Sequence, residues 1–231
     1  MKKIFYFTSS VAMSFFLTGC QNSILEANSE EVSNVKSVDS FKAYGRSTTG
    51  LTGSAVMLSD YLAQSGIKSN TEITQGMIDN AMSEVELEGE GVVSVSFVSE
   101  VLSGIHFANE NGTEALYRQI GFSDFVIEQL LRTEKFEDIS SCTNDTRYSS
   151  LSEKEKKFLD NVIIANTDLL AYLKDNPVVT LQSRNFDNNT LYSAITFGNV
   201  GMAIGFAFMP AGPLVGYVVG FAVGLVADIF K

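Results

Sequence analysis

Hydrophobic positions along the chain follow two patterns, one in the middle and one at the C-terminal end. From Ser54 onward, apolar residues return every three or four positions, which is the spacing of helices with one buried face. The segments with this spacing are 54–66, 71–85, 113–120, 123–131 and 152–175. We therefore expect the middle of the chain to be an α-helical bundle of about five helices joined by short loops.

The segment 92–107 fits both a strand and a helix. Its first half alternates apolar residues with serines, as strands do, whereas its second half has helical spacing. We favour a helix because the neighbouring segments are helical, and we expect a loop at 109–112 before a helix that Thr113 caps. The clearest start signal is the capping box at 152–155, which opens a helix that Asn176 and Pro177 end.

The C-terminal pattern is different, because no charged residue occurs between Asn188 and Ala227. Two apolar segments, 190–209 and 214–230, flank a turn that is rich in proline and glycine. Glycines recur in them at four-residue spacing, which places them on one side of a helix. These glycines are Gly201 and Gly205 in the first segment and Gly212, Gly216, Gly220 and Gly224 around the second. The sequence therefore predicts an apolar helical hairpin with a glycine face on each helix.

Glycine costs a helix about 0.8–1 kcal/mol per residue relative to alanine, so a repeated stripe needs a compensating contact. Small-residue repeats in membranes provide that contact by letting a second backbone approach closely. By its spacing, the stripe resembles the glycine-zipper segments of some envelope lipoproteins. We expect Gly216, Gly220 and Gly224 to form the contact face, and Asp228 to meet a partner or water at the helix end.

Length leaves two interpretations of the hairpin open. The segment 190–209 has 20 residues, about 30 Å of helix, which is enough to cross a hydrocarbon core. The segment 214–230 is at the short end of the spanning range. The hairpin can therefore lie in a membrane. It can also be buried in a soluble core, where it would resemble the hairpin of pore-forming colicins before insertion.

The N-terminus has the organisation of a secretory signal peptide. Lys2 and Lys3 precede an apolar stretch at 4–16. The next four residues, Leu17-Thr18-Gly19-Cys20, resemble the lipobox of bacterial lipoproteins. This resemblance implies cleavage before Cys20, a thioether-linked diacylglycerol on its sulfur, and acylation (palmitate, for example) of the new N-terminus.

Lipidation at Cys20 implies a location in the cell envelope, because two or three acyl chains anchor a protein stably. Gln21 stands where an aspartate would retain a lipoprotein at the inner membrane. The resemblance thus implies the outer membrane in a cell with two membranes, and otherwise the outer face of the plasma membrane. We divide the chain into a signal peptide at 1–19, a lipidated flexible tether at 20–50, an α-helical domain at 51–187 and the hairpin at 188–231.

The charge balance argues against nucleic acid as a partner. The formal net charge is −11 at pH 7, and removal of Lys2 and Lys3 with the signal peptide makes it more negative. Phosphate binding needs clustered lysine and arginine, and the same holds for electrostatic docking on anionic lipid. Membrane affinity must therefore come from the acyl chains on Cys20 and from the hairpin.

The residues that enzymes use are sparse in this sequence. His106 is its only histidine, its sequence neighbours are apolar, and we expect a core or surface histidine in place of a catalytic one. Cys142 is the one cysteine left after lipidation, so we expect an incidental thiol in place of an internal disulfide, with an intermolecular disulfide or a reactive thiol as the alternative. The glutamates at 84–90 are expected to form a solvated turn. We expect no catalytic residue, no metal site and no cofactor.

These observations together predict a mainly α, non-enzymatic envelope lipoprotein. Its expected partners are membrane lipid, through the acyl chains and the hairpin, and either a second copy of the chain or another envelope protein. Two alternatives remain open at this point. One is a soluble helical binding module with a buried hairpin, and the other is a membrane-active effector similar to bacteriocins or colicins.

Overall fold

The structure is a computed structural model that describes residues 50–65, 73–84, 93–176, 188–208 and 212–226. Every regular element in these ranges is a helix, so the predicted all-helical bundle is confirmed. The elements are α3 (Gly50–Gln64), α4 (Gln75–Glu84), α5 (Val95–Asn111), α6 (Thr113–Ile120), α7 (Asp124–Thr133), the 3₁₀ helix η3 (Ser140–Asn144), α8 (Thr146–Ser149), α9 (Glu153–Asp175), α11 (Asn188–Phe208) and α12 (Gly212–Leu225). The signal peptide, most of the tether, the acidic run at 85–90 and Asp228 lie outside the described residues.

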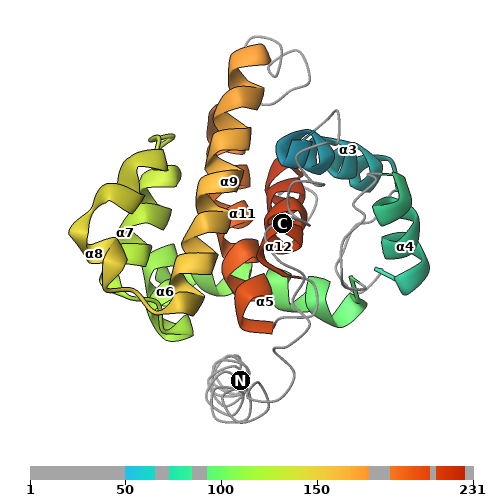
Figure 1. Ribbon diagram of the computed structural model, residues 1–231. Coiled ribbons are helices and arrows are strands. Elements are labelled where there is room, and N and C mark those ends of the chain that lie inside the picture. The colour runs from blue at the N-terminus through green and yellow to red at the C-terminus, as the bar shows by residue number, and fades with distance from the viewer. Residues whose placement is uncertain (1–49, 66–72, 85–92, 177–187, 209–211, 227–231) are drawn as a thin grey trace, which may run out of the picture. The chain divides into compact units, whose positions relative to one another are not determined.

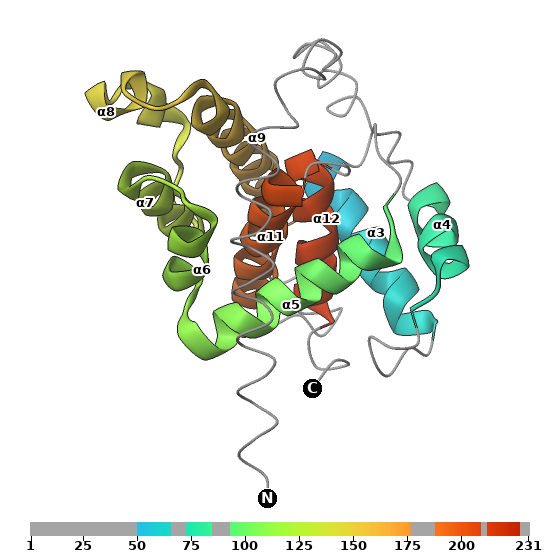
Figure 2. The same ribbon diagram turned by 90° about the horizontal axis from the view of Figure 1, so that it is seen from below.

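The predicted hairpin is present as α11 and α12, and the other helices surround it (Figure 1). Both α3 and α5 pack against α12, α5 also packs along α11, and α9 contacts both hairpin helices. Seen from below, α5 crosses the hairpin (Figure 2). Helix α4 attaches through α3, whereas α7 attaches through α6 and α9. Residues Tyr44–Lys231 form one compact unit, in which the hairpin provides the centre of the core.

The ambiguous segment is helical from Val95 through Phe107, as we expected, but the loop that we predicted at 109–112 is wrong. Helix α5 continues through Asn111 and breaks only at Gly112, whose φ is 89°. Polar groups support this last turn, because the Asn111 side chain donates to the Phe107 carbonyl oxygen at 3.0 Å and the Gly112 N–H donates to that of Ala108 at 2.8 Å. The Asn111 side chain, itself in the last turn of α5, thus provides a donor for a carbonyl oxygen near the helix end.

The expected cap at Thr113 is also wrong, because Gly112 precedes α6 and Thr113 is already helical. The helix ends as predicted at Gly121, which is left-handed with a φ of 95°. Two short elements, η3 and α8, were not predicted, since four or five residues carry too little periodicity to identify a helix.

Helix α9 is the longest described helix, and its predicted capping box is confirmed. The Ser152 hydroxyl accepts from the Glu155 N–H at 3.2 Å, while the Glu155 carboxylate accepts from the Ser152 N–H at 3.3 Å. Further along α9, Asp168 accepts from the N–H groups of Leu51 and Thr52 at 3.1 and 2.7 Å. A carboxylate on one helix therefore caps the N-terminus of another, where the helix dipole favours negative charge.

Three phenylalanine rings join the hairpin to this surrounding layer. Phe122 stacks on Phe158 of α9 with ring centroids 4.4 Å apart, and Phe206 of α11 lies 5.2 and 5.0 Å from the two. Such ring contacts stabilise a core beyond the area that they bury. They fix the C-terminal half of α11 against the start of α9.

Removal of the α9 cap should lower stability without changing the fold. We expect Ser152→Ala to reduce the free energy of unfolding by about 1 kcal/mol, because the Glu155 N–H loses its acceptor. Urea unfolding followed by circular dichroism measures the loss. The matched control is Ser150→Ala, an exposed serine at the end of α8, and equal losses in the two variants would contradict a specific capping role.

Candidate functional site

Among the described helices, the closest contact is between the glycine faces of α11 and α12. A Cβ atom added to Gly201 would overlap the carbonyl oxygen of Gly216, and one added to Gly216 would overlap the carbonyl oxygen of Gly201. The added Cβ of Gly201 would also lie 3.2 Å from the Cα of Gly220. The two backbones therefore touch directly, at a separation that only glycine permits.

The same contact extends along both helices. A Cβ on Gly220 would overlap the carbonyl oxygen of Phe197, and one on Gly205 would overlap that of Gly212. At the far end, a Cβ on Gly224 would lie 2.7 Å from the Ser193 carbonyl oxygen. Positions early in α11 thus meet positions late in α12, as an antiparallel hairpin requires.

Gly212 differs from the other predicted glycines. No atom lies within 4 Å of the place where its Cβ would stand, although its carbonyl oxygen faces Gly205. Its φ is +73°, a left-handed conformation that residues with a side chain rarely adopt. Gly212 therefore serves the turn through its backbone conformation, and Pro213 follows it in the first turn of α12.

Other elements of the chain cover the outer sides of the hairpin. All residues of α12 from Leu214 to Leu225 are buried. On α5, a Cβ added to Gly104 would lie 3.0 Å from Ile204 and 3.3 Å from Val200, so a third helix approaches the hairpin closely through a glycine that the sequence analysis did not single out. The stripe Gly216, Gly220 and Gly224 faces α11 of the same chain and not the surface.

The described part of the chain contains one helix that is long and apolar enough to cross a membrane. It is the 20-residue stretch Asn189–Phe208, and 67% of its 18-residue apolar part is buried inside the protein. A helix of this composition is either a span or the core of a soluble protein. In this fold, most of that stretch lies in the protein core.

A polar contact fixes the apolar α11 to the end of α7. Asn199, which is 2% exposed, donates from Nδ2 to the Thr133 hydroxyl at 2.8 Å and to the Leu130 carbonyl oxygen at 3.3 Å. Sequence reasoning missed this residue. The available signal was an amide in the middle of an apolar helix, which requires a buried partner.

A buried carboxylate lies beside that contact. Glu134 follows the last residue of α7 and is 5% exposed. It accepts from the Tyr117 hydroxyl at 3.0 Å and from the Thr113 hydroxyl at 3.4 Å. Desolvation raises the pKa of Glu134, although the two hydroxyl donors and Lys135 act in the opposite direction. Burial and the neighbouring Glu134 also raise the pKa of Tyr117.

A second polar position joins α12 to α3. The hydroxyls of Tyr217 and Thr52 lie close to each other, yet neither has a hydrogen-bond partner within bonding distance. Burial raises the pKa of Tyr217, as does the charge of Asp168 to a smaller degree. Tyr217 also packs its ring over α11, where a Cβ on Gly198 would lie 2.9 Å from it.

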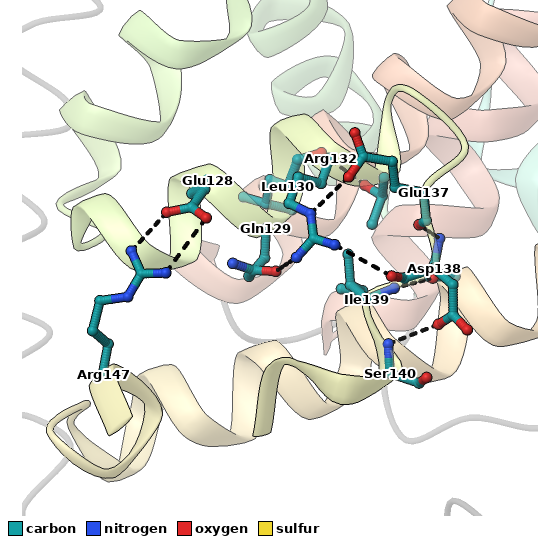
Figure 3. A network of polar contacts seen from close by, with 11 residues as sticks. Glu128, Gln129, Leu130, Arg132, Glu137, Asp138, Ile139, Ser140 and Arg147 are labelled. Carbon is teal, nitrogen blue, oxygen red and sulfur yellow. Dashed lines mark hydrogen bonds and ion pairs between the residues drawn. The ribbon is translucent and has the colours of Figure 1, made fainter. Parts of the chain in front are cut away.

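Two arginines organise a polar network on the surface (Figure 3). Arg132 donates from Nε to Glu137 at 2.8 Å, and Arg147 pairs with Glu128 at 2.7 Å. The Arg147 guanidinium also lies over the Phe125 ring, 4.6 Å from its centroid. The network connects α8 to α7 through Arg147 and Glu128, and the end of α7 to the segment after it through Arg132 and Glu137. Because these groups are mostly exposed and satisfy one another, the ion pairs add little stability.

A small apolar cavity of about 40 Å³ lies between α3, α4, α5 and α12. Leu58, Met77, Val98 and Val219 are among its lining residues. No polar atom contributes to its lining surface, so the cavity offers nothing that would orient a substrate. It is a packing feature beside the hairpin.

The remaining candidate residues from the sequence are Cys20, Cys142 and His106. Cys20 lies outside the described residues. Cys142 is buried in η3, where desolvation raises the pKa of its thiol, although the charge of Arg132 acts in the opposite direction. His106 is exposed on α5, where its Nε2 lies 3.3 Å from a Glu110 carboxylate oxygen, so it is a surface histidine. Within the described ranges, no group of three or more histidine, cysteine, aspartate or glutamate side chains could hold a metal ion.

Comparison of the sequence with protein-family models, with curated proteins and with solved structures gives no match. The geometry of the chain itself therefore carries the functional argument.

Replacement of a glycine by alanine should lower the free energy of unfolding at a packed position but not at an exposed one. We expect Gly220→Ala to reduce the free energy of unfolding by about 3 kcal/mol, because the new Cβ overlaps the Phe197 carbonyl oxygen and the backbones must separate. Gly76→Ala is the matched control, since no atom lies within 4 Å of its added Cβ and α4 gains helix propensity. We expect that control to be neutral or stabilised by about 0.5–1 kcal/mol in urea unfolding. Equal stability of the two variants would contradict backbone-to-backbone packing.

Burial should also make Cys142 slow to react. We expect its thiol to react with a maleimide at least about tenfold more slowly in the folded chain than in urea, because the thiolate is disfavoured and covered. Rapid labelling of the folded chain would instead support a reactive thiol, and Cys142→Ser shows the background reaction.

Proposed function

We propose that this chain is a non-enzymatic envelope lipoprotein, held at the membrane by acyl chains on Cys20. Its hairpin is the buried core of a helical binding module. The sequence motif at 17–20 supports the anchor, and the acidic composition favours a partner that presents basic groups, such as another envelope protein.

One observation favours this proposal over a membrane-resident hairpin. The glycine faces of α11 and α12 are filled by each other, and α3, α5 and α9 pack on the outer sides of the pair. A hairpin that spans the bilayer would present those outer sides to lipid, and a hairpin that self-associates through glycine would leave its stripe open. Neither surface is open in this fold.

A second candidate function is a membrane-active protein that releases the hairpin into a bilayer. The observation in its favour is the length of Asn189–Phe208, combined with the absence of charge from α11 and α12. In this candidate function, lipid replaces the helices that cover the hairpin, while the backbone contacts between α11 and α12 are kept.

The two functions predict different behaviour for a chain that begins at Gln21 and lacks the lipidated residue. We expect this chain to be a monomer in detergent-free buffer and to remain at the bottom of a flotation gradient with phosphatidylethanolamine–phosphatidylglycerol vesicles. The acylated full protein is the control and should float, because its acyl chains bind the bilayer.

Flotation of the unacylated chain, or its resistance to alkaline carbonate extraction, would contradict a hairpin buried in the folded protein. Release of a trapped dye from the same vesicles would identify the membrane-active alternative. An unacylated chain that forms stable dimers without lipid would instead point to self-association.

A further inference from the structure

The buried carboxylate of Glu134 lies where three helices meet, in what we term the α6–α7 corner. The corner consists of Thr113 and Tyr117 from α6, Leu130 and Thr133 from α7, Glu134 itself and Asn199 of α11. The backbone N–H of Glu134 and the Asn199 amide share one acceptor, the Leu130 carbonyl oxygen, and this links the residue that carries the ionisable group to the hairpin.

The ionised form of Glu134 is poorly supported in this corner. Its side chain is 5% exposed, and no Lys, Arg or His among the described residues lies within ion-pair distance of it. It also stands at the C-terminal end of α7, where the helix dipole disfavours a negative charge. Within the described part of the chain, its donors are the hydroxyls of Tyr117 and Thr113. A neutral carboxylic acid avoids the burial cost.

Among the groups that face one another in the corner, Glu134 is the main one whose charge changes on titration. Tyr117 of α6 is fully buried and has a pKa raised well above its ordinary value, so it stays neutral. Tyr192 of α11 acts on Tyr117 electrostatically, and Lys135 acts on Glu134 from the next position in the chain. Lys135 acts on Glu134 more weakly than the desolvation of the carboxylate does, and Tyr192 acts on Tyr117 more weakly than burial does.

The Leu130 carbonyl oxygen couples Glu134 to the hairpin. It accepts from the Glu134 N–H at 3.2 Å, from the Thr133 hydroxyl at 2.7 Å and from Asn199 Nδ2 at 3.3 Å. A shift of Glu134 toward solvent therefore disturbs the same acceptor that holds α11. The residues of α11 from 197 to 208 are otherwise apolar, so Asn199 provides the hydrogen bonds that attach this part of α11 to the corner.

We propose that Glu134 is a proton-controlled clamp on the hairpin. With a neutral side chain the α6–α7 corner holds Asn199 of α11, and with an ionised side chain the corner opens more often. The sign of the pH dependence follows from the thermodynamic linkage between protonation and stability. Because the folded pKa of Glu134 is raised, its contribution to stability is fully present below the ordinary glutamate range and is lost as the pH rises through the folded pKa.

Hydrogen exchange of the full chain in mild detergent tests this clamp. After correction for the intrinsic exchange rate, we expect the opening constant of amides in α6 and at the end of α7 to rise as the pH is raised from the ordinary glutamate range toward and through the higher pKa of Glu134. The rise for one proton is at most about tenfold per pH unit. Amides around Asn199 should change in parallel, because they share the Leu130 acceptor.

Two variants make the expectation specific. Glu134→Gln keeps an acceptor for Tyr117 but cannot ionise, so the pH dependence at the corner should disappear. Tyr117→Phe removes a donor that lowers the pKa of Glu134, so the rise should move to higher pH. The matched control is Asp79→Asn, an exposed carboxylate on α4 that accepts from Gln75 at 2.9 Å, and it should behave as the natural protein does.

Several outcomes would overturn the clamp. One is an unchanged pH dependence in Glu134→Gln, and another is a shift to lower pH in Tyr117→Phe. A response in α6 and α7 without any change around Asn199 would show that the corner titrates but does not hold the hairpin. Glu100 on α5 also has a pKa raised by partial burial, so a residual slope of the same sign outside the corner is expected in every variant.

Discussion

The fold depends on direct contact between the backbones of α11 and α12. Each glycine in the stripe weakens an isolated helix, so the pair is stable only when the helices are together. Once they are together, the hairpin presents apolar side chains on its remaining sides, and those sides require cover. The amphipathic periodicity of α5 and α9 meets that requirement, since each of these helices buries one face and keeps polar residues on the other. Helix α3 also covers the hairpin, but its first half is buried on all sides, from Leu51 to Val56.

Apolar helix surfaces fit one another in several registers, so a few buried polar groups specify the arrangement. Asn199 sets the position of α11 relative to α7, because its amide finds acceptors at one place only in the described corner. Asp168 does the same for α3 by capping its N-terminus from α9. The unpaired hydroxyls of Tyr217 and Thr52 mark an interface between α12 and α3 that is less completely satisfied.

Local chemistry made much of the fold predictable. The capping box at Ser152, the glycine end of α6 and the four-residue glycine spacing each act within one or two turns of helix, so the sequence shows them directly. The partner of the glycine stripe was not predictable, because the same spacing serves a second helix of the same chain, a second copy or a membrane neighbour. Only the three-dimensional structure shows that α11 fills it.

The buried polar groups lay beyond sequence reasoning for a related reason. Glu134 follows a helix and precedes Lys135, which is a typical surface pattern, and its burial results from α6 packing over it. The end of α7 is similarly unexpected, since Phe136 adopts a φ of 61° where a glycine is usual. Both features depend on contacts between segments that are distant in sequence.

The most direct measurement is an isotope-filtered nuclear Overhauser experiment on a mixture of labelled and unlabelled chains. It reports contacts between the α-protons of Gly201 and those of Gly216 and Gly220, and it separates contacts within a chain from contacts between chains. We expect strong cross-peaks within one chain, in buffer without lipid, because these backbones touch in the monomer. Cross-peaks that arise only between chains, or that appear only when lipid is added, would contradict a hairpin packed as the core of a single molecule.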